Sequence, residues 1–202
     1  MHPNPVFRKA EARKNIAFAR ERGFGVLAVN SRTGPLVSHI PFLLAENGAS
    51  ADLHLVRSNP IAQLGEIPAV IAAYGPDGYV SPDWYDVPDQ VPTWNYIAVH
   101  LRGRLRPLPQ EEMHDMLDRQ SAAYESRLGP KTPWAMEKMT ASARDRMMRQ
   151  ILPFRLEINA IDGTWKLNQN KSEKARMRAA DHIAQSHGQD LEALAQLMRK
   201  PD

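Results

Sequence analysis

The chain has 202 residues, of which 43% are hydrophobic and 24% are charged, and its formal net charge is +3. This length suits one domain with a substantial core, and the composition is ordinary for a globular protein. Because the sequence contains no cysteine, it excludes disulfides, thiolate metal sites and a cysteine nucleophile. The small net charge does not by itself indicate nucleic-acid binding, since proteins that grip the DNA backbone usually have a stronger basic excess.

The N-terminal residues lack the apolar stretch that defines a signal peptide. The longest apolar run, residues 69–74, is far too short to cross a bilayer. We therefore expect a soluble, cytoplasmic protein with no membrane partner.

The first half of the chain predicts one helix followed by several strands. Apolar residues on one face indicate a helix over residues 8–22, which Gly23 can end in the left-handed conformation. Short apolar or alternating stretches predict strands at residues 25–30, 36–44, 52–57 and 67–74. Turn-forming residues then dominate residues 75–89.

The second half mixes strands with longer helices. Residues 93–106 and 154–161 predict strands, whereas Pro109 and Gly129 delimit a predicted helix. Further helices are expected at residues 140–152, 172–186 and 190–199. This order lacks the regular strand–helix alternation of a doubly wound parallel sheet and favours a small antiparallel barrel with helices outside. We expect one domain over residues 1–202, with the C-terminal helices, about residues 172–200, packed on it.

Residues 53–60 (LHLVRSNP) form the first segment with functional character. A strand ends at Arg57, and Ser58 or Asn59 can cap a short helix that begins at Pro60. A guanidinium beside a hydroxyl and free backbone N–H groups suits an anion, and arginine binds phosphate bidentately. An ordinary capped turn with an exposed arginine explains the same residues, and for this segment alone it is the stronger interpretation.

Two further segments add aromatic and amide groups. Residues 79–85 and 91–100 place two tryptophans, three tyrosines, Thr93 and Asn95 around one proline-rich loop, which suits a flat heterocycle with polar edges. Simple covering of a barrel end by Trp84 and Trp94 explains them equally well. Residues 164–172 (TWKLNQNKS) carry amides and lysines that could read a ring edge and neutralise an anion, or form a solvated turn.

No side chain stands out as a catalytic acid, base or nucleophile. The seven histidines lack a close metal-ligand spacing, so a zinc site is not expected. The sequence contains no nucleophile elbow, Walker loop or Rossmann glycine pattern. This absence is compatible with a sensor, and equally with an enzyme whose cofactor carries the chemistry.

Together these segments resemble the PaiB family, the FMN-binding negative transcriptional regulators. The motifs follow the family's order: H-L-x-R-x-N-P at residues 54–60, S-P-x-W-Y at 81–85, V-P-T-W-N-Y at 91–96 with His100 and Gly103 after it, and K-L-x-Q-N-K at 166–171. The resemblance implies a mainly β, α+β fold: an antiparallel split β-barrel flanked by helices, like that of pyridoxamine-phosphate oxidase. It also implies a homodimer with FMN at the subunit interface.

Carried over by position, the family's flavin contacts fall on ten residues: His39, Arg57, Ser58, Asn59, Trp84, Thr93, Asn95, Lys166, Gln169 and Lys171. The resemblance implies that Arg57, Ser58 and Asn59 contact the flavin phosphate. Thr93 and Asn95 would line the ring or ribityl chain with Trp84 nearby. The residues from Lys166 to Lys171 would reach the site from the end of the barrel, in this subunit or a second one, and His39 lies on a strand that supplies ligand contacts.

The resemblance leaves three functions open. The first is an FMN-binding regulator or sensor whose flavin controls a protein or DNA interaction. The second is a small flavin-dependent oxidoreductase of the pyridoxamine-phosphate-oxidase type. The third is a structural or interaction dimer without a ligand. Residues 172–199 could supply two helices, but their apolar stripe suggests packing, so direct DNA reading has weak support.

Overall fold

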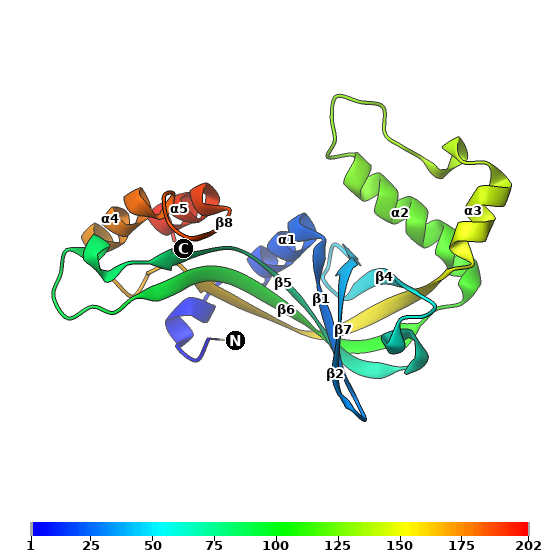
Figure 1. Ribbon diagram of the computed structural model, residues 1–202, viewed down its shortest axis with the longest axis horizontal. Coiled ribbons are helices and arrows are strands. Elements are labelled where there is room, and N and C mark those ends of the chain that lie inside the picture. The colour runs from blue at the N-terminus through cyan, green and yellow to red at the C-terminus, as the bar shows by residue number, and fades with distance from the viewer. Residues whose placement is uncertain (1, 202) are drawn as a thin grey trace. The chain divides into compact units, whose positions relative to one another are not determined.

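A computed structural model describes residues 2–201; Met1 and Asp202, the two ends of the expected domain, lie outside the described residues. In the described part of the chain, eight strands form one mainly antiparallel sheet (Figure 1). The strands are β1 (Phe24–Ser31), β2 (Gly34–Pro41), β3 (Leu43–Leu44), β4 (Ser50–Val56), β5 (Ile67–Val80), β6 (Thr93–Pro107), β7 (Ile151–Lys166) and β8 (Gly188–Gln189). Their order is β2-β1-β5-β6-β7-β4-β3, and β8 pairs with β5 off this path.

Within residues 2–201, five α-helices accompany the sheet: α1 (Ala12–Arg22), α2 (Met113–Glu125), α3 (Ala141–Met148), α4 (Glu173–Ile183) and α5 (Leu191–Arg199). Short 3-10 turns occupy η1 (Pro5–Arg8), η2 (Pro60–Gln63), η3 (Pro82–Tyr85), η4 (Gln110–Glu112) and η5 (Met136–Lys138). None of the helices within residues 2–201 is both long and apolar enough to span a membrane.

The chain forms two compact units, neither of which is a continuous segment. Unit 1 comprises the residues up to Asn15, Ala73–His100 and the residues from Asp162 onward. Unit 2 comprises Ile16–Ala72 and Leu101–Ile161. The boundaries fall inside β5, β6 and β7, so each of these long strands gives one part to each unit.

Unit 2 is built on the β1–β2 hairpin and on β4, which pairs with both β3 and β7. Its largest fully buried side chains include Leu27, Phe42, Leu53, Ile71, Leu101, Leu105, Met113, Met116 and Phe154. Gly23 adopts the predicted left-handed conformation, with φ of +55°. The Tyr124 hydroxyl lies 2.6 Å from the Gly23 carbonyl oxygen, so the end of α1 is fastened to α2.

Unit 1 is built on the remaining parts of β5, β6 and β7, with α4 and α5 packed on the sheet (Figure 1). Gly78 lies beneath the helices: a Cβ there would come within 2.9 Å of Leu191 and 3.0 Å of Leu194. Leu194, Ala195 and Met198 of α5 are buried. The apolar stripe of the C-terminal helices therefore serves packing, as its sequence suggests.

Several element boundaries differ from the sequence prediction because strand pairing overrides local preference. Residues 75–78 predict a turn, but β5 continues to Val80 and pairs with β8. The helix expected over residues 140–152 ends at Met148, because Ile151 and Leu152 already pair with β4. The helix expected from residue 8 begins at Ala12, after the separate 3-10 turn η1.

Candidate functional site

The ten residues singled out from the sequence divide between the two units. His39, Arg57, Ser58 and Asn59 belong to unit 2, and the other six belong to unit 1. The structure therefore forms two separate polar clusters, each of which has its own geometry.

The turn after β4 is held by Asn59. Its Oδ1 accepts a hydrogen bond from the Ile61 amide at 3.0 Å, which makes it the predicted N-cap of η2. Its Nδ2 donates to Ser38 Oγ on β2 at 3.1 Å. Because both ends of the amide are engaged, Asn59 fixes the shape of the turn. The sequence predicted the cap, but not Ser38.

Arg57 is held in place by neutral acceptors. Its Nε donates to the Arg149 carbonyl oxygen at 2.5 Å, and its Nη2 donates to Gln110 Oε1 at 2.9 Å. Neither acceptor carries a charge, so these contacts orient the guanidinium without neutralising it. Arg57 and Ser58 are both exposed. This end of β4 therefore presents an oriented positive charge next to a hydroxyl, which is the chemistry of an anion site.

His39 lies on β2 and is exposed. It follows Ser38 directly, and successive side chains of a strand point to opposite faces. The strand face that meets Asn59 therefore carries Ser38, and His39 is on the other face. The structure does not bring His39 to the Arg57 turn.

In unit 1, Lys166 at the end of β7 donates a hydrogen bond from Nζ to Thr93 Oγ1 at the start of β6. Burial lowers the pKa of Lys166, and the charge of Lys171 lowers it further. Lys171 in turn donates to Gln90 Oε1, and its Nζ lies 4.8 Å from the centroid of the Tyr85 ring. Two ammonium groups thus repel each other while both are satisfied by neutral oxygens.

The turn that joins these lysines is shaped by Asn168, which is in the left-handed conformation with φ of +63°. Asn168 is buried, and its Oδ1 lies 3.3 Å from the Tyr85 hydroxyl. Tyr85 is fully buried, and burial raises the pKa of its hydroxyl. An aromatic side chain from the 81–85 motif therefore supports the 166–171 motif from inside the unit. The sequence placed both motifs at one site but did not indicate this contact.

Gln169 braces its own turn. Its Oε1 accepts from the Leu167 amide at 2.8 Å, and its Nε2 donates to the Trp165 carbonyl oxygen at 2.6 Å. Both ends of the Gln169 amide are hydrogen-bonded to backbone groups, so the side chain stabilises the turn that carries Lys166 and Lys171.

Two other predicted contacts are turned toward α4 and α5. Asn95 is fully buried, and its Nδ2 donates to Met198 Sδ at 3.3 Å. Trp84 stacks on His182, with ring centroids 5.7 Å apart and an interplanar angle of 24°. Trp84 thus packs against α4 in this structure.

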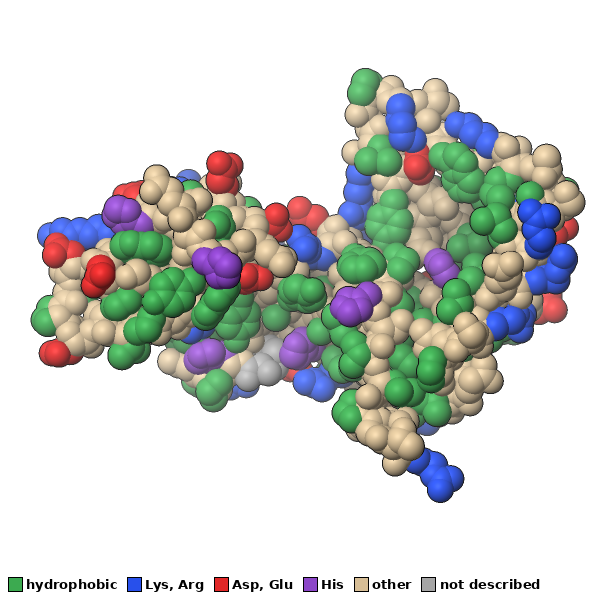
Figure 2. All heavy atoms as spheres, viewed as in Figure 1, with side chains coloured by type: hydrophobic (Ala, Val, Ile, Leu, Met, Phe, Trp, Pro, Cys, Tyr) green, Lys and Arg blue, Asp and Glu red, His purple; other side chains and the backbone are tan. Residues whose placement is uncertain are grey.

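An aromatic surface that the sequence did not define lies over β5 and β6 of unit 1. Tyr74 and Trp94 are 45% and 43% exposed, and with Tyr96 they line a shallow cavity of about 270 Å³. Figure 2 shows hydrophobic side chains gathered over these strands. The alternation of side chains along a strand could have identified this surface from the sequence. Trp94 and Tyr96 share one face of β6, while Thr93 and Asn95 share the other.

Comparison with known proteins decides the family. A family model described as "Putative FMN-binding domain" matches residues 1–160. The chain belongs to this FMN-binding family. The match includes the Arg57 turn and Thr93 and ends before Lys166.

This FMN-binding family member is also similar in sequence to one relative and in fold to two solved structures. The chain is 25% identical over 202 residues to the "Protease synthase and sporulation protein PAI 2" of Bacillus subtilis, covering 98% of this chain and 96% of that protein. A FAD- and heme-binding protein from Mycobacterium smegmatis matches with a TM-score of 0.57 and 14% identity, over 79% of this chain and 73% of that one. A flavocytochrome from Azotobacter vinelandii matches with a TM-score of 0.56 and 12% identity, over 82% and 72%.

These findings confirm the resemblance to the PaiB family and the predicted fold class. The FMN-binding family member has a mainly antiparallel sheet with flanking helices, and its structural neighbours are flavin-binding split barrels. The predicted cofactor, FMN, is the flavin of this family.

Proposed function

We propose that the protein is a homodimeric, FMN-dependent negative regulator or sensor of the PaiB type. The Lys166–Lys171 pair is the observation that carries this proposal. Burial and the charge of Lys171 lower the pKa of Lys166, and the two ammonium groups donate to Thr93 and Gln90, which are neutral. A neighbouring anion would relieve this repulsion, so the pair is suited to the electron-rich edge of a flavin.

The Arg57 turn suits the phosphate of FMN. Arg57 is oriented by Gln110 and by the Arg149 carbonyl oxygen, and Ser58 offers a hydroxyl beside it. Asn59 acts as a positioning residue, since its amide is used to cap η2 and to hold Ser38. Charge-assisted, bidentate contacts of this kind are among the stronger hydrogen bonds in proteins.

When bound, FMN supplies reversible one- and two-electron chemistry. The residues of the chain would bind and orient it: Arg57 and Ser58 the phosphate, and Lys166, Lys171 and Thr93 the flavin side. His39, Trp84, Asn95 and Gln169 hold other positions in the structure, and we propose that they support the fold or the dimer around the site.

A regulatory role is supported by the B. subtilis relative, whose name links it to sporulation and protease synthesis. Within the described residues, α5 places Leu194, Ala195 and Met198 in the interior of unit 1, which argues against its use as a DNA-reading helix. We therefore propose that flavin binding or flavin redox state controls a contact with another protein, rather than a direct contact with DNA bases.

The proposal is tested first by the absorption spectrum and mass of any flavin that co-purifies, and by titration of apo-protein with FMN. Replacing Arg57 with Gln or Lys166 with Met should each weaken FMN binding about 10- to 100-fold, since each removes a charge-assisted hydrogen bond. The matched controls are Arg32→Gln and Lys174→Met, which alter exposed residues of the same types. No FMN binding, or equal weakening by the controls, would overturn the site.

The oligomeric state and the activity then separate the alternatives. Sedimentation measures the oligomeric state and so tests the dimer. FMN binding is then measured for a mixture of R57Q and K166M. If mixing restores binding, the two clusters act from different copies. NAD(P)H consumption by FMN-loaded protein without selective binding to DNA or to a captured regulator would favour the small oxidoreductase over the regulator.

A further inference from the structure

The aromatic surface over β5 and β6 of unit 1 includes a carboxylate. Asp77 lines the shallow cavity of about 270 Å³ on this surface together with Tyr74, Trp94 and Tyr96. All four residues belong to unit 1, and none of them is among the residues assigned to FMN. This Asp77 cavity is slightly smaller than most small-molecule sites, which measure roughly 300–1,000 Å³. Its size suits a head group rather than the whole of a large ligand.

Strand geometry places the Asp77 side chain on the same face as the rings. The ring centroids of Tyr79 and Trp94 lie 6.3 Å apart, so Tyr79 is on the face of the sheet that carries Trp94. Asp77 precedes Tyr79 by two residues in β5, and alternate residues of a strand share a face. Gly78, between them, faces the other way, because a Cβ there would come within 2.9 Å of Leu191 on α5. The carboxylate therefore lies beside exposed rings and on the face opposite α5.

The charge of Asp77 has no cationic partner in the chain. Within residues 2–201, its carboxylate makes no ion pair and no side-chain hydrogen bond. Asp86 and Asp181 of the same unit, in contrast, are each paired with an arginine. A carboxylate beside ring surfaces favours a cation, because the rings displace part of the water that would screen its charge. The same charge disfavours the phosphate of a flavin at this place.

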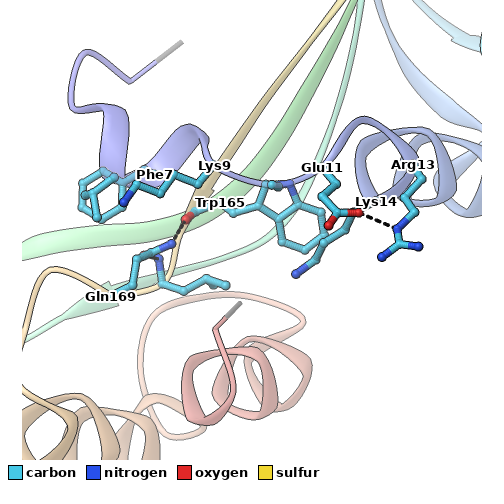
Figure 3. A pocket seen from close by; sticks show the side chains of 10 residues that line it. Phe7, Lys9, Glu11, Arg13, Lys14, Trp165 and Gln169 are labelled. Atoms are coloured by element: carbon cyan, nitrogen blue, oxygen red, sulfur yellow. Dashed lines mark hydrogen bonds and ion pairs between the residues drawn. The ribbon is translucent and has the colours of Figure 1, made fainter.

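The ring faces of the Asp77 cavity are also not used by cations of the chain. Elsewhere in unit 1, Lys14 holds its Nζ 4.3 Å from the centroid of the Trp165 ring (Figure 3), and Lys171 lies over Tyr85. Among the described side chains, no lysine or arginine lies over a ring of the Asp77 cavity. These rings are therefore available to a cation that comes from outside the chain.

The central ring of the surface, Trp94, is held in place although it is exposed. The Tyr79 ring contacts it at an interplanar angle of 75°, and the His187 ring contacts it at 73° with centroids 6.1 Å apart. Such T-shaped contacts are the arrangement that aromatic pairs favour, so they orient the indole. A ring oriented before the ligand arrives loses little side-chain entropy on binding.

We propose that the Asp77 cavity binds the head group of a small quaternary ammonium compound, with the cation against the rings of Tyr74, Trp94 and Tyr96 and beside the Asp77 carboxylate. The negative faces of aromatic rings attract cations. A quaternary ammonium group has no N–H to donate, so rings and a nearby negative charge recognise it better than hydrogen-bond acceptors do. This inference does not depend on FMN binding, because it uses none of the groups assigned to the flavin.

Choline is the probe, and 3,3-dimethyl-1-butanol, which has the same shape without the charge, is the control ligand. Each is titrated at constant ionic strength into full-length protein, with and without FMN, at pH 8, where histidines are neutral and carboxylates are ionised. Binding is followed by the indole N–H resonance of Trp94 in protein labelled with ¹⁵N-tryptophan, and Trp94→Phe identifies this resonance. We expect choline to shift it saturably and to bind at least about tenfold more tightly than the alcohol.

Asp77→Asn removes the charge at nearly constant shape, and Tyr74→Leu removes an exposed ring. Each should weaken choline binding at least about fivefold, and far-UV circular dichroism checks that each variant is folded. Asp83→Asn, which alters an exposed aspartate of the same unit, is the matched control and should change binding less than about twofold.

Three results would overturn the proposal. The first is equal binding of choline and the neutral alcohol. The second is a D77N or Y74L protein that binds choline as well as wild type. The third is no shift of the Trp94 resonance, or displacement of choline by FMN, which would mean that a second copy or the flavin covers this surface. Because the protein is also titrated without FMN, a failure of FMN binding does not affect this test.

Discussion

The most exacting stability prediction concerns Asp52, a buried carboxylate in the strand that leads to Arg57. Its side chain is 6% exposed and receives hydrogen bonds from Arg155 Nε at 2.6 Å, Arg155 Nη2 at 2.9 Å and Arg119 Nη2 at 3.0 Å. Arg119 also contacts Asp115, which is 72% exposed. One carboxylate therefore fastens β4 to both β7 and α2.

Replacing Asp52 with Asn keeps the volume but places a donor amide against two guanidinium groups. Removing one partner from a fully buried ion pair costs about 3–5 kcal/mol. The side chains of Arg155 and Arg119 are 29% and 43% exposed, so water still solvates part of their charge. We therefore expect a loss of about 2–3 kcal/mol in the free energy of unfolding, or roughly 5–10 °C in Tm for a chain of this size.

Urea denaturation followed by far-UV circular dichroism at pH 7.5 measures this loss. Asp115→Asn is the control, because it removes an exposed partner of the same Arg119 and should cost less than about 0.5 kcal/mol. Burial alone would raise the pKa of Asp52, but the hydrogen bonds from Arg155 and Arg119 outweigh it and the net pKa is lowered. The contribution is thus complete above the usual pKa of 3.8 and disappears as pH falls through the folded value. A D52N protein as stable as wild type at pH 7.5 would refute this reasoning.

Two other predictions concern the half-buried His54 and the buried Gly103 of unit 2. Burial lowers the pKa of His54 although a side-chain hydrogen bond to Gln120 raises it, so the stabilising contribution of His54 is present above the usual pKa of 6.5 and declines as pH falls below it. This group should lower the unfolding free energy by up to about 1 kcal/mol between pH 7.5 and pH 5.5. Urea titrations of His54→Gln at these two pH values should show a smaller difference in unfolding free energy than wild type. An unchanged difference would contradict the assignment. Gly103→Ala should destabilise by about 3 kcal/mol or more, because its Cβ would lie 1.8 Å from the Glu157 carbonyl oxygen, whereas Gly129→Ala, with open space around it, should change the urea midpoint little. Equal midpoints for the two variants would show that the backbone relaxes.

Local rules predicted the features that depend on one stretch of chain. Gly23 ends α1 in the left-handed conformation, and Asn59 caps the turn that begins at Pro60. Both outcomes follow from conformational preferences of single residues. The same is true of Ser172, which caps α4 as its helix prediction implies.

Long-range pairing explains what the sequence did not show. Ser38, Gln110 and Arg149 orient the Arg57 turn from other elements, and no spacing in the sequence identifies them. The family motif V-P-T-W-N-Y looks like one aromatic and amide patch, but strand alternation sends Asn95 inward and Trp94 outward. Period-2 geometry applied to that motif would have predicted this division.

The hydrogen bonds from Lys166 to Thr93 and from Lys171 to Gln90 have a consequence for the strength of ligand binding. The chain supplies its own substitute oxygens to both ammonium groups, so an incoming anion must exchange with them rather than fill an unmet need. Gln90 in this sense is an internal competitor, tethered in the loop before β6 at a high effective concentration. The observed affinity for the anion would then reflect the difference between its binding to the ammonium groups and the binding of the chain's own oxygens to them. A substitution in the loop that carries Gln90 would change this affinity without contacting the ligand.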